Sequence, residues 1–381
     1  MNDSAVPPEA GRVRRRRMWP IVLLTLTVLV AGSVFWGYRS LSGNIDTIDP
    51  SAGLGDVRPA KENESMNILL VGSDSREGAN SSVGGESPGL ADTTILLHLS
   101  ADNSWATGVS IPRDSMVQMP DCLESDGSTH AGGLRQFNQA YVIGGPVCVQ
   151  RTVESLTDLH IDHFVVVDFS GFQQMVDSLG GITVDVAEPI SDPDSKIYFD
   201  TGCQTLDGEQ ALDYVRVRHG VGNGSDLGRI ERQQQFLADV VQQVTSKGTL
   251  LNPVTLYQFL DAATSTVTTD TGIGSIQAMA GIAVRARAVG LNNINFTTVP
   301  VEAWPQDPNR VQWQEPTATE LWESLASDTS LTPVEVSPSA EPTNGGTPSE
   351  QTADAAGSSA SASASPSISA RTADTPVCSA S

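Results

Sequence analysis

The chain has nineteen residues in a row, Met18 to Trp36, without an ionisable side chain, directly behind arginines at positions 12 and 14 to 17. About 20 apolar residues in a helix cross the roughly 30 Å hydrocarbon layer of a bilayer. Because basic residues hold their end of such a helix in the cytoplasm, the pattern predicts a cytoplasmic tail (1–17), one transmembrane helix (18–38) and an extracytoplasmic remainder. The small residues Ala31 to Ser33 also suit a cleavable export signal. Both interpretations place the rest of the chain outside the cytoplasm.

The exported part is strongly acidic. The chain has 22 basic and 45 acidic residues, and 17 basic and 43 acidic ones remain beyond the apolar stretch and the tail before it. A body of that charge does not attract nucleic acid or anionic headgroups as general partners. A cluster of basic residues in it therefore needs a local reason.

Composition divides the exported part into three. Residues 39–65 are rich in Gly, Ser, Asp, Glu and Pro with little periodicity, which is typical of a stalk. Residues 331–381 contain no aromatic residue and one basic residue, Arg371, so this Ser/Ala/Thr/Pro-rich tail is predicted to be disordered. One folded domain is expected between them, at 66–330.

Strand and helix patterns alternate within that domain. Apolar runs at 67–71, 93–99 and 164–169 predict strands, each with a polar loop at one end. Helical spacing then leads to a stop at Gly180, and a further run at 182–186 predicts a strand. This succession indicates an α/β domain in which helices cover a sheet.

Two later segments position basic residues. Asp207 and Gln210 resemble a helix cap, and the alternation over 214–218 predicts a strand that puts Arg216 and Arg218 on one face. A helix is expected from Asp226 to about residue 244.

The scarce basic residues gather in this region: Arg216, Arg218, Arg229 and Arg232 fall within seventeen residues. Arg229, Arg232 and Gln233 share one face of the expected helix, in its first turns. Arginine near a helix amino end is unfavourable unless an anion is close, and a bound phosphate suits both the guanidinium groups and the free N–H groups. The alternative is pairing with acidic side chains of the same helix.

Two carboxylates flank apolar runs: Asp74 follows the first run and Asp92 precedes the second. A few carboxylates completed by substrate phosphate are what Mg²⁺ prefers, with Mn²⁺ as the alternative ion. Single aspartates at strand ends are more often turn formers. Arg113 adds a charged loop, and a metal with arginines is how charge on a transferring phosphoryl group is stabilised.

Four cysteines are present, and an exported domain permits disulfides. Cys122 and Cys148 flank one loop-rich stretch and are the expected pair. Cys203 is expected to stay free, and whether it pairs with Cys378 is left open.

Seven segments resemble, in order, the LytR-CpsA-Psr family over residues 66 to 245. They read NILLVGSDSR, ADTTILLHLS, SIPRDS, FNQAYVIGG, VDFSGFQQMVDSLGGITVDV, LDGEQALDYVRVRHG and DLGRIERQQQFL. The resemblance implies an α/β/α sandwich with a mixed central sheet and an apolar pocket for a polyprenyl tail. The cysteine pair is similar to that of the actinobacterial branch.

The resemblance also implies roles for single residues. Asp74 and Asp92 would hold the metal, and both would take part in catalysis with Arg113 and Arg218. Phosphate contacts would come from six residues: Arg76, Arg113, Arg216, Arg218, Arg229 and Gln233. Arg135 and Arg232 carry over less directly, Arg135 as the basic residue nearest a family lysine and Arg232 as a packing residue.

The chain departs from the family pattern at two positions. Leu90 stands where many members have an arginine, so catalytic assistance is expected from elsewhere or to be weaker. Asp185 stands where the actinobacterial branch has a cysteine, which leaves Cys203 without that partner.

The expected activity is a phosphotransfer that moves a glycopolymer from a polyprenyl-phosphate carrier to peptidoglycan, at the outer face of the cell membrane. A wall-sugar hydroxyl would attack the phosphorus nearest the glycan, and lipid phosphate would leave. One alternative is a pyrophosphatase that uses water on the same lipid class. The other is a wall-binding or lipid-phosphate-binding module without enzymatic activity, against which the paired Asp74 and Asp92 argue.

Overall fold

The computed structural model describes residues 12–55, 57–74, 89–124, 126–193, 195–217, 226–331, 371–372 and 378. An eight-stranded mixed sheet forms the centre of this part of the chain, in the order β1-β14-β9-β2-β3-β4-β15-β18. In chain order its strands are β1 (Asp46–Ile48), β2 (Met66–Ser73), β3 (Ala91–Leu99), β4 (Ala106–Ser110), β9 (His163–Asp168), β14 (Val267–Asp270), β15 (Ile294–Thr298) and β18 (Arg371–Thr372).

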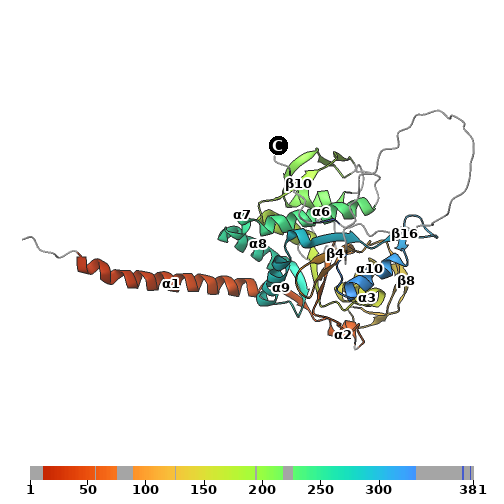
Figure 1. The fold of residues 1–381 in the computed structure, drawn as a ribbon, viewed down its shortest axis with the longest axis horizontal. Helices are drawn as coiled ribbons and strands as arrows, with labels where there is room; N and C mark the ends of the chain where they lie inside the picture. The colour runs from red at the N-terminus through yellow and green to blue at the C-terminus, as the bar shows by residue number, and fades with distance from the viewer. Residues whose placement is uncertain are drawn as a thin grey trace, which may run out of the picture.

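Helices cover both faces of the sheet (Figure 1). In chain order, the helices of the described residues are α1 (Arg12–Ser42), which projects away from the sheet, α2 (Ser51–Leu54), α3 (Gln139–Thr157), α4 (Phe169–Ser178), α5 (Gly208–Arg216), α6 (Asp226–Thr245), α7 (Lys247–Leu250), α8 (Pro253–Thr266), α9 (Ile276–Val289) and α10 (Thr317–Ala326), with a 3₁₀ turn at Leu291–Asn293. The predicted α/β/α layering is therefore present.

Small two-stranded sheets decorate the edges. Their strands are β5 (Met116–Met119) with β8 (Gly133–Gln136), β6 (Cys122–Leu123) with β7 (Thr129–His130), β10 (Ile182–Val186) with β13 (Gly202–Leu206), β11 (Ile190–Asp192) with β12 (Ile197–Phe199), and β16 (Val301–Ala303) with β17 (Val311–Trp313). The strand expected at 182–186 is thus present as β10, but it pairs with β13 in a separate sheet and is not part of the central one.

One face of the sheet is fully packed. Leu69 and Leu96 have no exposed surface there, and they pack against α3 and α10 through residues such as Val149 and Leu321. The alternation of inward and outward residues in β2 and β3 produces this face, because successive side chains in a strand point to opposite sides.

The opposite face is apolar but incompletely covered. Ile68, Leu99 and Phe296 are buried beneath α6 and α9. Around them lies a set of half-buried apolar side chains from the sheet and these helices: Met66, Leu70, Leu97, Val165, Leu237, Val241 and Ile282. The two faces of one sheet therefore differ in how far helices shield them.

The segment expected to be a stalk is part of the domain. β1 pairs in parallel with β14 at the edge of the central sheet. Arg58 forms an ion pair with the buried Glu154 of α3 and donates to the carbonyl of Ile161 at 2.7 Å. The stalk prediction for residues 46–65 is wrong because backbone pairing and a partly buried ion pair hold this segment, and neither depends on apolar periodicity.

The segment expected to be a disordered tail also contacts the domain. β18 pairs antiparallel with β15, and Cys378 is bonded to Cys203 of β13. The expectation that Cys203 stays free is therefore wrong, because it is paired with Cys378. Strand pairing and a covalent bond order these residues without the apolar burial that composition measures.

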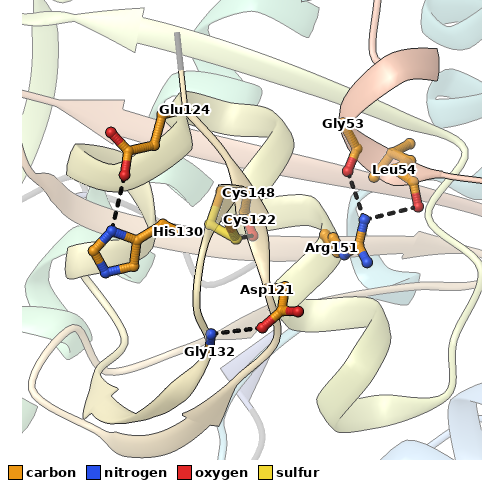
Figure 2. The surroundings of a disulfide bond; sticks show 9 residues. All are labelled: Gly53, Leu54, Asp121, Cys122, Glu124, His130, Gly132, Cys148 and Arg151. Atoms are coloured by element: carbon orange, nitrogen blue, oxygen red, sulfur yellow. Dashed lines mark hydrogen bonds and ion pairs between the residues drawn. A yellow bond between two sulfur atoms is a disulfide. The ribbon is translucent and has the colours of Figure 1, made fainter. Parts of the chain in front are cut away.

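The expected disulfide between Cys122 and Cys148 is present, with a Cα–Cα distance of 5.5 Å (Figure 2). It joins β6 to the middle of α3. Asp121 and Glu124 fix the same loop, accepting hydrogen bonds from the Gly132 amide at 2.7 Å and from His130 at 2.9 Å. Both sulfur-bearing residues are buried.

Helix α1 covers the predicted transmembrane stretch and projects away from the body (Figure 1). The apolar side chains described in it, from Val22 to Leu29 and at Phe35, are exposed. Among the helices as far as they are described, none is both long and apolar enough to cross a membrane.

Candidate functional site

Polar residues from several strands emerge at one edge of the central sheet. β2 runs parallel to β9, β15 runs parallel to β4, and β3 runs antiparallel to both β2 and β4. The carboxyl ends of β2, β4, β9 and β15 and the amino end of β3 therefore meet. Asp74 directly follows β2, and Asp92 is the second residue of β3.

Asp74 is held by the strand opposite to it. Its backbone N–H donates to the Leu90 carbonyl at 3.2 Å, and its carboxylate oxygen Oδ1 accepts from the Leu90 N–H. Position 90, where many family members have an arginine, thus supports Asp74 through its backbone.

Asp92 lies in a β-bulge. Ser73 pairs with Ala91 and Gly72 pairs with Thr93, so Asp92 is an extra residue in β3 without a partner in β2. A bulge bends a strand and redirects the side chain of the extra residue. The redirected carboxylate forms an ion pair with the guanidinium group of Arg113.

Further polar contacts hold the loop of Arg113. The Nε atom of Arg113 lies 3.5 Å from Asp114 Oδ2, and Asp114 Oδ1 accepts a hydrogen bond from Gln136 at 3.2 Å. The Asn138 amide donates to the Arg113 carbonyl at 3.1 Å. Arg135 precedes Gln136 in β8, and its buried Nε has no hydrogen-bond partner among the described residues. The weakly predicted Arg135 therefore lies in the segment that packs beside Arg113.

Gln234 joins α6 to the same edge, a contact that the sequence does not indicate. The buried amide nitrogen of Gln234 donates to Ser110 Oγ at 2.9 Å, the Thr297 carbonyl at 2.8 Å and Thr298 Oγ1 at 3.2 Å. These acceptors end β4 and β15. Since Arg113 follows β4 by three residues, the contact fixes α6 at the sheet edge from which the Arg113 loop leaves. A buried amide looks like any surface glutamine in a sequence.

Arg232 and Gln233 hold the end of α5. The Arg232 guanidinium donates to the carbonyl of Val217, and Gln233 Nε2 donates to the carbonyl of Val215 at 3.1 Å. Burial lowers the pKa of Arg232, while the nearby Tyr214 and Glu231 raise it. The guanidinium group of Arg232 thus contacts the backbone at the end of α5, and its role in the site stays a prediction. For Gln233, the phosphate contact stays a prediction.

Arg216 and Arg229 differ in exposure. Arg216 is exposed in the last turn of α5, with its guanidinium 4.3 Å from the centre of the Phe169 ring, and Arg229 is 3% exposed in the first turn of α6. The strand predicted over 214–218 is wrong as far as Arg216, because the capping box at Asp207 starts a helix that continues through Tyr214 and Val215.

Arg76 and Arg218 lie outside the described residues. Their predicted phosphate contacts therefore stay predictions.

The carboxylates at the edge suit a magnesium ion in their chemistry. Asp74 and Asp92 each use one carboxylate oxygen in the contacts above, and among the described residues the second oxygen of each accepts no hydrogen bond. Mg²⁺ takes one or two carboxylates and completes its shell with water and substrate phosphate. No group of three or more His, Cys, Asp or Glu residues in the described part of the chain could hold a metal alone. A site here would thus need ligands from water and substrate.

A further carboxylate, Asp239 of α6, has a shifted pKa. Burial, with a smaller contribution from Asp185, raises the pKa of Asp239 to about 7, and the hydrogen bond from Gln235 at 3.0 Å opposes the shift. Its other oxygen is buried without a described partner. Asp239 is two turns beyond Arg232 and belongs to the helix rather than to the sheet edge.

Comparison with known proteins places the chain. Residues 40–327 match the LytR_cpsA_psr family. The probable cell wall biosynthesis protein LcpB of Corynebacterium glutamicum is 35% identical over 282 residues, which cover 71% of this chain and 64% of LcpB. The chain thus spans slightly less than two thirds of that relative. Polyisoprenyl-teichoic acid–peptidoglycan teichoic acid transferase TagU of Oceanobacillus iheyensis is 31% identical over 80% of this chain and 91% of TagU.

The fold has solved counterparts. The crystal structure of Bacillus subtilis TagV superimposes with a TM-score of 0.55 at 26% identity, covering 71% of this chain and all of TagV. The family match includes β1, which the sequence analysis assigned to a stalk, and it ends one residue after α10. With most of its length matched, the chain belongs to the LytR-CpsA-Psr family.

Proposed function

We propose that this protein is a phosphotransferase that moves a glycopolymer from a polyprenyl-phosphate carrier to peptidoglycan during cell-wall assembly. The observation that supports this best is the Asp92–Arg113 ion pair at a β-bulge, at the sheet edge where Asp74 follows β2 and where Gln234 of α6 is hydrogen-bonded to the ends of β4 and β15. Relatives named as cell wall biosynthesis proteins and teichoic acid transferases agree with it.

Each part of the sheet edge has a task in this reaction. Arg113 neutralises charge on the phosphate oxygens, together with the arginines of α5 and α6. A hydroxyl of a wall sugar attacks the phosphorus nearest the glycan, the bond from that phosphorus to the lipid phosphate breaks, and the hydroxyl proton moves to a base. Asp74 and Asp92 are the candidate acceptors of that proton.

Asp74 and Asp92 would also hold the proposed Mg²⁺, or Mn²⁺. When bound, the ion supplies positive charge that stabilises the phosphate oxygens of the substrate. Because Arg113 already pairs with Asp92, it fixes the direction of that carboxylate before substrate arrives. The edge is thus organised by the protein's own contacts.

The half-buried apolar face of the sheet is the proposed binding surface for the polyprenyl tail. Its side chains Leu70, Leu97 and Val165 are apolar yet only partly covered. Leu70 lies four residues before Asp74, and every second residue of a strand points to the same face, so a tail along this face would end near the carboxylates. Helix α1 is the proposed single membrane anchor, with the amino terminus cytoplasmic and the domain outside, because its apolar side chains from Val22 to Leu29 and at Phe35 are exposed.

The direct test supplies the full-length protein in detergent with a synthetic polyprenyl-pyrophosphoryl glycan and peptidoglycan fragments, with Mg²⁺ or EDTA. Wild type is compared with Asp92→Asn and Arg113→Gln, and with Lys196→Gln as the control, an exposed basic residue between β11 and β12. Glycan phosphate linked to peptidoglycan, lost with EDTA and in the first two variants only, supports the proposal.

Other outcomes contradict it in different ways. Release of free glycan phosphate without transfer would assign a pyrophosphatase. Tight lipid binding without turnover would assign a binding module. Turnover unaffected by EDTA would remove the metal from the mechanism.

A further inference from the structure

Helix α1 meets the body at one end, between two other helices. Asn44, just after α1, donates to Asp261 of α8 at 3.1 Å, and Gln277 of α9 donates to the hydroxyl of Tyr38 at 2.5 Å. Figure 1 shows α1 leaving the body from this end, where α7, α8 and α9 lie. The orientation of α1 therefore determines which end of the domain faces whatever surface α1 enters.

That end carries large apolar side chains in solvent. Leu251 is 79% exposed and Val254 63% exposed at the junction of α7 and α8, and Val284 of α9 is 69% exposed. Leu260 of α8 is also exposed. Single exposed apolar residues are common on protein surfaces, so their position matters more than their number. All four belong to the two helices, or the junction, that hold the base of α1.

The charge of this end differs from the charge of the whole chain. Residues 247–290 contain three basic residues and two acidic ones, against 22 and 45 overall. Both acids are engaged, Asp261 by Asn44 and Asp270 by His163 at 3.1 Å. Arg287 is exposed. Acidic charge that would repel an anionic membrane is thus sparse at this end compared with the whole chain.

We infer that the end of the domain formed by α7, α8 and α9, the α7–α9 end, rests on the outer surface of the lipid bilayer, with Leu251, Val254 and Val284 in the headgroup region. The inference rests on the proposed function, because it takes α1 as the anchor. A surface of apolar side chains next to an inserted helix buries its apolar area at the headgroup boundary, and basic residues add attraction to anionic lipids.

The inference adds a route for the lipid substrate. Helix α6 contacts the sheet edge through Gln234 and leads to α7, and its 20 residues span about 30 Å. Along it, Leu237 and Val241 belong to the half-buried apolar face. A polyprenyl tail leaving the membrane at the α7–α9 end would follow this face toward Asp74.

Labelling tests the contact directly. The four cysteines form two disulfides, so an introduced cysteine is the only thiol. Val254→Cys and Val284→Cys carry an environment-sensitive NBD dye, in the full-length protein reconstituted into phosphatidylcholine–phosphatidylglycerol vesicles. Leu134→Cys of β8 and Tyr198→Cys of β12 are matched controls, because both positions are also exposed.

The expected result is a blue-shifted emission at positions 254 and 284 that brominated lipids quench, with neither effect at positions 134 and 198. Emission typical of water at all four positions would overturn the inference. A blue shift at 254 and 284 that brominated lipids leave unquenched would overturn it too, and would assign the surface to a second copy of the chain.

Flotation of the vesicles separates this inference from the anchor. If the full-length protein does not float with vesicles, α1 is no anchor and the proposed function loses its membrane component. If it floats and the dyes stay in water, the anchor stands and only the contact of the α7–α9 end fails.

Discussion

The amide nitrogen of Gln234 lies 2.9 Å from the hydroxyl oxygen of Ser110, and this bond joins α6 to the end of β4. The same nitrogen reaches the Thr297 carbonyl at 2.8 Å, so one side chain connects α6 to two neighbouring strands. The contact fixes α6 against the strand end that Arg113 follows by three residues.

Replacing Gln234 with leucine should therefore reduce both stability and turnover. The change leaves buried acceptors unpaired, which costs about 1–3 kcal/mol in the free energy of unfolding. Urea unfolding and a transfer assay measure the two effects. Gln258→Leu, at an exposed position of α8, is the control and should change neither. Equal behaviour of the two variants would remove the positioning role from Gln234.

The buried Asp239 predicts a pH dependence of stability. Its pKa is about 7 in the folded protein, against an ordinary value of 3.8. Between these values the folded protein holds a proton that the unfolded chain has released, so the free energy of unfolding falls as pH rises through this window and the contribution is lost above it.

Asp239→Asn should lack that pH dependence, because an amide has no proton to release. We expect the variant to be more stable than wild type at about pH 8 and to lose its advantage at about pH 4.5, as measured by thermal unfolding. If the stability of wild type and variant changed with pH in parallel, folding would not raise the pKa of Asp239, which would contradict this account.

The two disulfides should differ in their response to a reductant. Cys203 is exposed, whereas Cys122 and Cys148 are 2% and 3% exposed. Because thiol attack needs access to the sulfur, mild dithiothreitol should open the Cys203–Cys378 bond first. Mass spectrometry after alkylation identifies the modified residues, and early alkylation of Cys122 would contradict the expectation.

Gly208 should not tolerate a side chain. A Cβ atom there would lie 2.4 Å from the Gln173 carbonyl oxygen, so alanine would push α5 from α4 at a cost of about 1–3 kcal/mol. Gly281 of α9 has no atom within 4 Å of such a Cβ, and alanine there should raise stability by up to about 1 kcal/mol. Chemical denaturation of both variants should give opposite signs, and two changes of the same sign would contradict this account.

The strands at the centre were predictable from sequence because burial requires apolar runs there. β2, β3 and β9 lie within a few residues of the expected runs, and the capping box at Asp207 is present as read. The disulfide of Cys122 followed from two cysteines around one loop.

Edge strands were missed for a physical reason. β1 and β18 gain their order from backbone hydrogen bonds to β14 and β15, and a backbone bond leaves no mark on composition. The short alternation at Tyr214 to Arg216 misled because four or five residues fit a strand and the last turn of a capped helix equally well.

The site was partly predictable. Asp74, Asp92 and Arg113 stand together as charged residues at strand ends, a position that sequence can indicate. The bulge at Asp92 and the anchoring amide of Gln234 depend on pairing between distant segments. No local pattern reports such pairing.

The bond between Cys203 and Cys378 makes a covalent ring of the chain between these two residues, and the ring contains α5 through α10. One protease cut anywhere in that ring opens it without releasing a fragment, so a clipped molecule would migrate as one species until it is reduced. Loss of the carboxyl-terminal piece during growth of the wall would need two cuts, or one cut and a reductant.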